Sequence, residues 1–374
     1  MALIRRLLPL LLVSSTLAAQ QKTPGVSTKV TTTSGTPPPN AKQAEVQDVR
    51  RLKGAPLADP YELERLGLAA IGQGLLPRAR KFFEDSWKVG ELPTAAYNLA
   101  CVDLREGRRD DALKHLSMAL RAGFDDELTL KNDTDLAKLR GGPEFAGFLE
   151  LARKNRAEGD AAVVRDALFV VPKAVAGIVV LLHDASSEPF ATSGPFTAEA
   201  QRRGLVLAVP RGPARVGSKG FGWADAPRGL TAVEAVVEEA KKRARTATVP
   251  VYLVGIGRGG VLAYSIAALK AGFAGVASLG GAYDPGQASV NGLRGVRLFM
   301  GMPKDAPANV KEAMNRGANA LKSKGLSPTF RVWPGSGATL PDDAGAAARD
   351  ALTGVTGHDG GTTSRFPPTP SGKA

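Results

Sequence analysis

The sequence has few residues that carry out covalent chemistry. It contains one cysteine and three histidines among 374 residues. The lone Cys101 excludes a disulfide within the chain, and no cysteine near the N-terminus can carry a lipid. Cys101 falls on the inner face of a predicted helix, which indicates a small buried hydrophobic residue rather than a reactive thiol. We predict no cofactor and no metal site.

Long hydrophobic runs are also missing, and no stretch is apolar enough to cross a membrane as a helix. The longest N-terminal run, residues 7–13, follows Arg5 and Arg6 and precedes the small residues Thr16, Ala18 and Ala19. This pattern is typical of a secretory signal peptide. We predict a signal peptide over 1–19 and export to the periplasm or the extracellular space. An N-terminal membrane anchor is the alternative.

Charge of one sign is in excess, because the net charge is +13 and the pI is about 9.9. The basic residues are nevertheless dispersed. Their main cluster, residues 241–245, closes a predicted amphipathic helix, where cations are favourable in any case. No nucleic-acid recognition motif accompanies them. We therefore predict no nucleic-acid partner.

Composition divides the remaining chain into four segments. Residues 20–58 and 357–374 are rich in Thr, Ser, Pro and Gly, which predicts a disordered linker and a disordered tail. Residues 60–155 are predicted to be helical repeats. Residues 164–356 alternate apolar runs with amphipathic stretches, which predicts a mainly parallel sheet covered by helices on both faces. The expected fold is therefore an all-α repeat domain followed by an α/β domain.

The helical repeats are visible as a shift of 33 positions. Gly74, Ala79, Phe83 and Ser86 are echoed by Gly107, Ala112, Leu116 and Ala119. This pattern resembles the tetratricopeptide repeat, whose stacked helices form concave surfaces that take up peptides or partner proteins. The resemblance implies a protein or peptide partner. The alternative is that the repeats only cover the neighbouring domain.

The stretch VYLVGIGRGG, residues 251–260, predicts a strand, a glycine-rich turn and a helix. Gly255, Gly257 and Gly260 satisfy the dinucleotide fingerprint G-x-G-x-x-G. The same stretch fits the serine-hydrolase elbow G-x-S-x-G with glycine at the nucleophile position. At least two strands precede this turn, and no acid follows the next strand until Asp284, so the dinucleotide hypothesis is the weaker one.

The surrounding motifs favour the hydrolase elbow. LVLAVPRGP, GFGWADAP, the elbow and GVASLGGAYDP follow one another in an order that resembles the phospholipase/carboxylesterase branch of the α/β-hydrolases. The resemblance covers nearly all of residues 164–355. It implies a nucleophile at Gly257, a base at Ala338 and a displaced acid at Asp305. Neither glycine nor alanine can act in these roles, so the triad is not intact.

Other residues of this region suggest a second use. The resemblance places His183 beside an oxyanion hole, where it is more often structural than a base, and Asp184 replaces a glycine there. The turn presents backbone N–H groups at a helix N-terminus. Our hypothesis is that a carboxylate or phosphate docks there, with Asp184 opposing it unless an arginine pairs with Asp184. The residues concerned are Gly257, Arg258, Gly259, His183, Asp184 and Arg211.

The sequence thus predicts an exported, non-catalytic protein of the hydrolase fold that works by binding. One alternative is an esterase with displaced catalytic groups, for which Ser186, Ser187, Ser265 and His358 are candidates by residue type. A second alternative is a dinucleotide-dependent enzyme that uses Gly255, Gly257 and Gly260.

Overall fold

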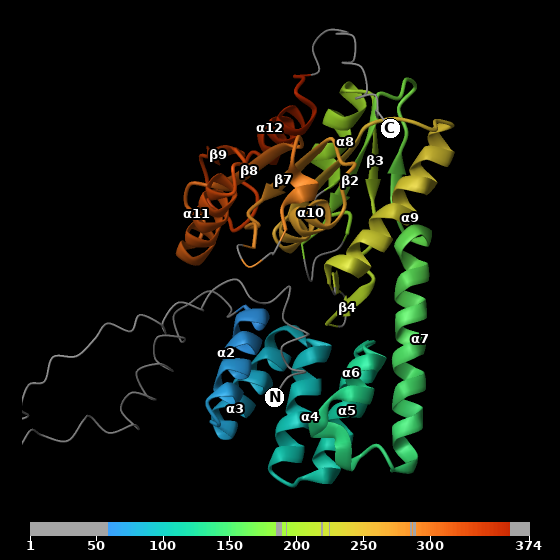
Figure 1. Cartoon of the computed structure of the whole chain (residues 1–374), viewed down its shortest axis with the longest axis vertical. Coiled ribbons are helices and arrows are strands. Elements are labelled where there is room, and N and C mark those ends of the chain that lie inside the picture. Colours follow the sequence, from blue (N-terminus) through green and yellow to red (C-terminus); the bar gives the residue numbers. More distant parts are fainter. Residues whose placement is uncertain are drawn as a thin grey trace, which may run out of the picture.

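The computed structural model describes residues 59–359 except 185–188, 192, 218–219, 224, 285 and 287–288. The predicted signal peptide, the linker and most of the tail lie outside these residues, as do Ser186 and Ser187. Helices occupy one end of the described chain and a sheet covered by helices occupies the other (Figure 1). None of the helices in the described part has the length and apolarity to cross a membrane.

The helical end begins with two similar helix pairs. They are α2 (Pro60–Gly72) with α3 (Leu76–Gly90), and α4 (Pro93–Arg105) with α5 (Arg109–Arg121). Corresponding helices start 33 residues apart, the period found in the sequence. Small residues make this pairing possible, because a Cβ atom on Gly67 would overlap the ring of Phe83. Assignment of these pairs to the tetratricopeptide family stays a prediction.

Three further helical elements complete this end. They are α6 (Glu127–Asn132), the 3₁₀ helix η1 (Thr134–Lys138) and α7 (Pro143–Arg165). The long α7 runs alongside the pairs and continues toward the sheet (Figure 1). Its core with α4 and α5 is apolar and includes Tyr97 and Phe124, whose rings stack with centroids 4.6 Å apart.

The sheet has seven strands in the order β1-β3-β2-β6-β7-β8-β9. In chain order the strands are β1 (Leu168–Val170), β2 (Gly177–Leu182), β3 (Leu205–Val209), β6 (Val251–Ile256), β7 (Gly275–Leu279), β8 (Arg297–Pro303) and β9 (Thr329–Trp333). Every neighbouring pair is parallel except β1 with β3. The prediction of a mainly parallel sheet is confirmed, and the strand order is consistent with an α/β-hydrolase-like domain.

Helices cover both faces of the sheet, as its uniformly apolar strands require. On one face, Ile178 and Val180 of β2 belong to the core formed with α9 (Ala226–Ala244), α10 (Arg258–Leu269) and α11 (Ala308–Ser323). On the other face, Val179 and Leu181 pack with α8 (Ser193–Arg202) and α12 (Ala344–Thr356). A short 3₁₀ helix, η2 (Asn291–Leu293), precedes β8.

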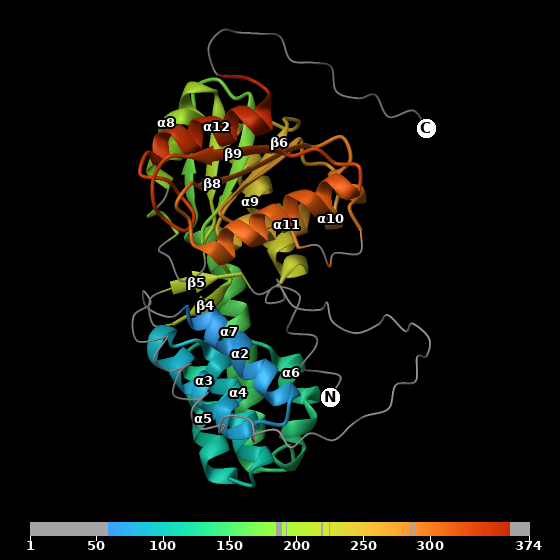
Figure 2. The same ribbon diagram turned by 90° about the vertical axis from the view of Figure 1, so that its left-hand side faces the viewer.

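A two-stranded ribbon, β4 (Ala214–Val216) and β5 (Gly220–Gly222), joins the two ends of the molecule. It lies between the sheet and the helices (Figure 2). Val216 packs against Leu92 and Ala95 of the repeats. Gly217 approaches the carbonyl oxygen of Gly90 so closely that a Cβ atom would lie 2.6 Å from it. The helical end is therefore packed directly on the α/β part.

An ion-pair network reinforces this junction. Arg228, at the start of α9, has a side chain only 4% exposed and donates to Asp125 at 2.6 Å and to Asp160 at 2.8 Å. Both carboxylates belong to the helical end. Burial raises the pKa of Asp125, and the charge of Arg228 opposes that shift. The arginine therefore compensates a carboxylate that is poorly solvated.

We expect Arg228→Met to destabilise the protein by about 3 kcal/mol, because it leaves Asp125 buried without its cation. Urea denaturation followed by circular dichroism would measure the loss. Arg165→Met is the matched control, since the pairs that Arg165 makes with Glu158 and Asp166 are exposed and should contribute little. Equal losses in the two variants would contradict a special role for the junction.

Candidate functional site at the glycine elbow

The glycine turn adopts a sharp strand–turn–helix geometry. Strand β6 ends at Ile256, and Gly257 has φ 52° and ψ −116° immediately before α10. A side chain at this position would be strained. Two further glycines allow close approach, because a Cβ atom on Gly259 would overlap Leu182 and one on Gly281 would overlap Gly257. This is the geometry expected of a hydrolase elbow.

The carboxyl group of Asp184 fills the space in front of the elbow. A Cβ atom on Gly257 would overlap this group, so Asp184 lies where a nucleophile side chain would begin. The backbone N–H of Arg258 donates to Asp184 Oδ1 at 2.9 Å. A negative charge is favourable there because the N-terminus of α10 carries a partial positive charge. The chain itself therefore supplies an anion to its own elbow.

His183 is held in place by hydrogen bonds. Its Nε2 accepts the N–H of Gly212 at 2.9 Å, which assigns the proton to Nδ1, where it donates to the Asp184 carbonyl at 2.7 Å. The side chain of Trp223 donates to the His183 carbonyl at 3.0 Å. His183 is fully buried, and burial lowers its pKa to about 4. These contacts make a neutral imidazole that orients the loop ahead of Asp184.

The two arginines of the anion-site hypothesis have their guanidinium groups elsewhere. Arg211 pairs with Asp166 at 2.9 Å and lies 4.2 Å from the centre of the Phe221 ring. Arg258 lies 3.5 Å from the centre of the Tyr61 ring. The backbone N–H of Arg258 thus donates to Asp184, while the guanidinium group of Arg258 stacks on the ring of Tyr61.

The positions of the missing base and the displaced acid lie near one another. A Cβ atom on Gly280 would lie 2.7 Å from the Ala338 carbonyl oxygen, and the next residue, Gly281, touches the elbow. The N–H of Asp305 donates to the Gly335 carbonyl at 3.2 Å, in the loop that contains Ala338. The fold brings the three positions implied by the resemblance to one edge of the sheet. Two of them carry no catalytic side chain.

Two of the substitute groups named from the sequence, Ser265 and His358, lie within the described residues, and neither is placed for catalysis. Ser265 is 4% exposed and donates to the Val261 carbonyl within α10 at 3.0 Å. His358 follows α12, whose Val355 lies against Gly275 at the amino end of β7. The elbow is at the carboxyl end of β6. A five-residue strand is about 16 Å long, so His358 is far outside hydrogen-bond reach of the elbow.

Two residues of α2 complete the site and were not predicted from the sequence. Tyr61 contacts Arg258 through its ring, and Glu64 is only 1% exposed. Glu64 Oε1 accepts a hydrogen bond from Asn98 at 3.1 Å, whereas Oε2 has no partner among the described residues. Burial raises the pKa of Glu64 to about 7, with the neighbouring Thr94, the charge of Arg258 and the hydrogen bond from Asn98 opposing the shift.

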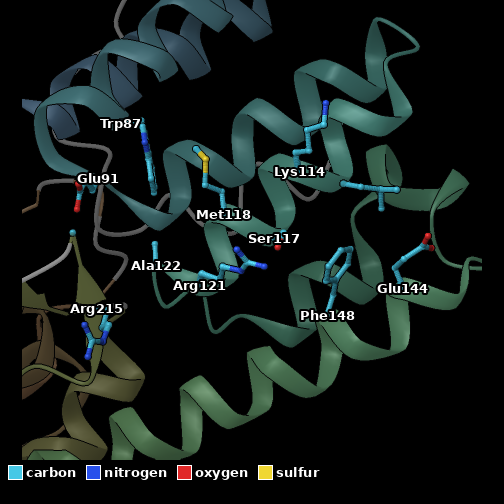
Figure 3. Close-up of a pocket in the computed structure, with 12 residues that line it drawn as sticks. Trp87, Glu91, Lys114, Ser117, Met118, Arg121, Ala122, Glu144, Phe148 and Arg215 are labelled. Atoms are coloured by element: carbon cyan, nitrogen blue, oxygen red, sulfur yellow. The ribbon is translucent and has the colours of Figure 1, made fainter.

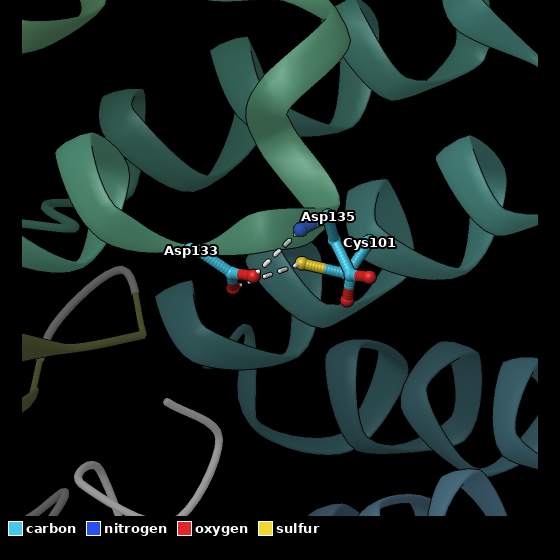
Figure 4. Close-up of side chains that lie close together, drawn as sticks. All are labelled: Cys101, Asp133 and Asp135. Atoms are coloured by element: carbon cyan, nitrogen blue, oxygen red, sulfur yellow. Dashed lines mark hydrogen bonds between the residues drawn. The ribbon is translucent and has the colours of Figure 1, made fainter. Parts of the chain in front are cut away.

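A second polar cluster lies inside the repeats, where Cys101, Asp133 and Asp135 come together (Figure 4). Asp133 accepts hydrogen bonds from Tyr97 at 2.5 Å and from the backbone N–H of Asp135 at 2.9 Å. Arg105 binds the Asp135 carboxylate at 2.7 Å. These bonds engage both carboxylates and cap η1. Burial raises the pKa of the Cys101 thiol well above its usual value, which disfavours a thiolate ligand.

Comparison with known proteins adds little to the site. No protein-family model matches the sequence, and no curated protein matches it. An uncharacterised protein from Bacillus cereus ATCC 10987 is 18% identical with a TM-score of 0.42, over 79% of this chain and 98% of that one. Esterase PE8 is 16% identical with a TM-score of 0.38, over 50% of this chain and 98% of its own.

A Zea mays acyl-protein thioesterase 2 is 13% identical with a TM-score of 0.39, over 50% of this chain and 98% of that one. Such low identities and TM-scores support no conclusion about activity. The seven-stranded, mainly parallel sheet and the glycine-rich strand–turn–helix elbow are consistent with the α/β-hydrolase-like fold expected from the sequence.

Proposed function

We propose that this chain is an exported, non-catalytic protein of the α/β-hydrolase type that works by binding another protein or peptide. The position of the Asp184 carboxyl group at the elbow carries the proposal. The carboxyl group occupies the space of a nucleophile side chain. It also accepts the hydrogen bond from the backbone N–H of Arg258, which in an active hydrolase would donate to an oxyanion. An elbow occupied in this way by the chain's own carboxyl group has a structural role rather than a catalytic one.

Charge strengthens the argument against acyl transfer. Acyl transfer develops negative charge on the substrate oxygen, and enzymes place hydrogen-bond donors at that oxygen. Here the N–H of Arg258 already donates to Asp184, and the carboxylate would repel a developing oxyanion. Gly257 has no side chain that could attack a substrate, and Ala338 has no group that could accept a proton from a nucleophile. Three separate steps of the reaction therefore lack a group that performs them.

Helix α2 brings the helical end against the elbow. Tyr61 packs on Arg258, the first residue after the elbow, and thereby fixes the repeats to the α/β part. The hypothesis of an anion site at the elbow now requires that a bound carboxylate or phosphate first displace the Asp184 carboxyl group. The same carboxylate would oppose a pyrophosphate, which weakens the dinucleotide alternative.

The test is hydrolysis of a panel of p-nitrophenyl esters, from acetate to octanoate, by the purified full-length chain. We expect no release of p-nitrophenol above the rate of buffer alone between pH 6 and 9. Turnover that a single substitution of a serine, histidine or aspartate abolishes would refute the proposal. A thermal-shift screen with NAD and FAD addresses the dinucleotide alternative, and we expect no change in melting temperature.

A further inference from the structure

A groove of about 930 Å³ lies along α5, away from the elbow. Its walls come from α3, α5, α7 and the ribbon of the α/β part (Figure 3). The lining residues are Trp87, Glu91, Leu113, Lys114, Ser117, Met118, Arg121, Ala122, Glu144, Phe148, Arg215 and Gly217. Both ends of the molecule therefore contribute to one hollow.

This groove uses the second helix of each pair. The first helix of the second pair, α4, is buried along nearly its whole length, and Tyr97 on it is covered by Phe124 and Asp133. Its surface is not accessible to a partner. The face of α5 that carries Met118 and Arg121 is accessible instead. The helical end therefore offers a partner the side of α5 rather than that of α4.

The floor of the groove is apolar and elongated. Trp87, Met118 and Phe148 are half-buried there and pack at the edge of the helical core. A rise of 1.5 Å per residue separates Leu113 from Ala122 by about 13 Å along α5. An extended peptide advances about 3.3 Å per residue, so the groove accommodates about four residues. The half-buried apolar floor suits side chains such as Leu or Phe.

Among the residues that line the groove, positive charges exceed negative ones by one. Within the described ranges, neither Arg121 nor Arg215 has a carboxylate partner, although Arg215 lies 5.7 Å from the centre of the Phe221 ring. The other charged residues that α5 and α7 contribute to the groove are paired. Lys114 pairs with Asp111 at 3.1 Å, and Glu144 pairs with Arg109 at 3.8 Å. The exposed Glu91 offsets only one of the two arginines.

We propose that the groove binds a short acidic peptide segment of a partner protein. Apolar side chains of the segment contact Trp87, Met118 and Phe148, and its acidic side chains pair with Arg121 and with Arg215. Arginine suits this task because its planar guanidinium donates two parallel hydrogen bonds to a carboxylate. The inference rests on the proposed function and names the partner class and the surface.

Fluorescence anisotropy with dye-labelled, amidated peptides tests this inference on the full chain. The probes are Phe-Leu-Leu-Glu-Asp, its basic counterpart Phe-Leu-Leu-Lys-Lys, and the polar counterpart Gly-Ser-Ser-Glu-Asp. We expect only the first peptide to bind in the micromolar range at low salt, and added salt to weaken it. Arg121→Glu and Arg215→Glu should each weaken binding by about tenfold or more.

Lys138→Glu is the matched control, since Lys138 is an exposed cation of the repeats outside the groove. Circular dichroism shows whether each variant is folded. Equal binding of the three peptides, or equal affinity of the native chain and both arginine variants, would overturn the inference. These outcomes leave the absence of ester turnover unaffected, so failure of the groove and failure of the non-catalytic proposal are distinguishable.

Discussion

Glu64→Gln is expected to stabilise the protein at pH 8 by about 3 kcal/mol and to have little effect at pH 4. Burial is the cause, since it raises the pKa of Glu64 from 4.5 to about 7. Between about pH 4.5 and pH 7, the native state therefore keeps a proton on Glu64 that the unfolded chain releases. Stability conferred by the native residue falls as pH rises from about 4.5 to about 7 and is then constant. Glutamine carries no charge and avoids this loss.

The substitution preserves the local geometry. Glutamine has nearly the shape of a protonated glutamate, and its carbonyl oxygen can accept the hydrogen bond from Asn98. The groups around Glu64 and Tyr61 that also carry charge are Arg258, Asp184 and Asp59. They are unchanged in the variant, so the difference between the two proteins isolates the titration of Glu64.

Urea denaturation of both proteins from pH 4 to pH 8 measures the effect. Glu62→Gln serves as the control, because Glu62 lies on the exposed side of the same helix and its side chain is 48% exposed. We expect the control to follow the pH dependence of the native chain. A constant difference between native and Glu64→Gln proteins across this range would show that Glu64 does not titrate there.

Gly257→Ala is expected to destabilise the protein by about 3 kcal/mol or more, because two costs coincide. The backbone has φ 52°, which alanine adopts only with strain, and the added methyl group would overlap the Asp184 carboxyl group. Gly295→Ala is the matched control. Its φ of 76° is also positive, but a Cβ atom there would meet nothing within 4 Å. The control should lose clearly less stability.

A double-mutant cycle separates the two costs. Asp184→Gly removes the carboxyl group, so Gly257→Ala should cost at least about 1 kcal/mol less in that background. The free energy of unfolding of the four proteins gives this coupling directly. A coupling of zero would show that Asp184 does not fill the space in front of Gly257, and the central observation of the site would be wrong.

Local patterns predicted much of the fold. Uniformly apolar runs such as residues 177–182 gave the buried parallel strands, and the 33-residue shift is repeated in the starts of α2 and α4. The glycines at 257 and 259 predicted a tight strand–helix turn because few other residues tolerate that geometry. The resemblance to α/β-hydrolases implied Ala338 and the elbow as parts of one site; in the structure Gly280 lies beside Ala338, and the next residue, Gly281, touches Gly257.

Contacts between distant segments were not predictable from these patterns. Tyr61 reaches Arg258 across nearly two hundred residues, and no local rule relates the two. A signal for Glu64 does exist, since it precedes Gly67 and Ile71 by three and seven positions and thus lies on the buried face of α2. The position of Asp184 in front of Gly257 depends on how the loop after β2 folds, which the sequence does not specify.

The most direct test of the non-catalytic proposal is labelling of the full chain with a fluorophosphonate probe, followed by mass spectrometry of its peptides. The probe reacts with any activated serine, whatever the natural substrate. With Gly257 at the elbow and Asp184 on the first N–H of α10, we expect no labelled serine. Stoichiometric labelling of one serine, lost when that serine is replaced by alanine, would contradict the account.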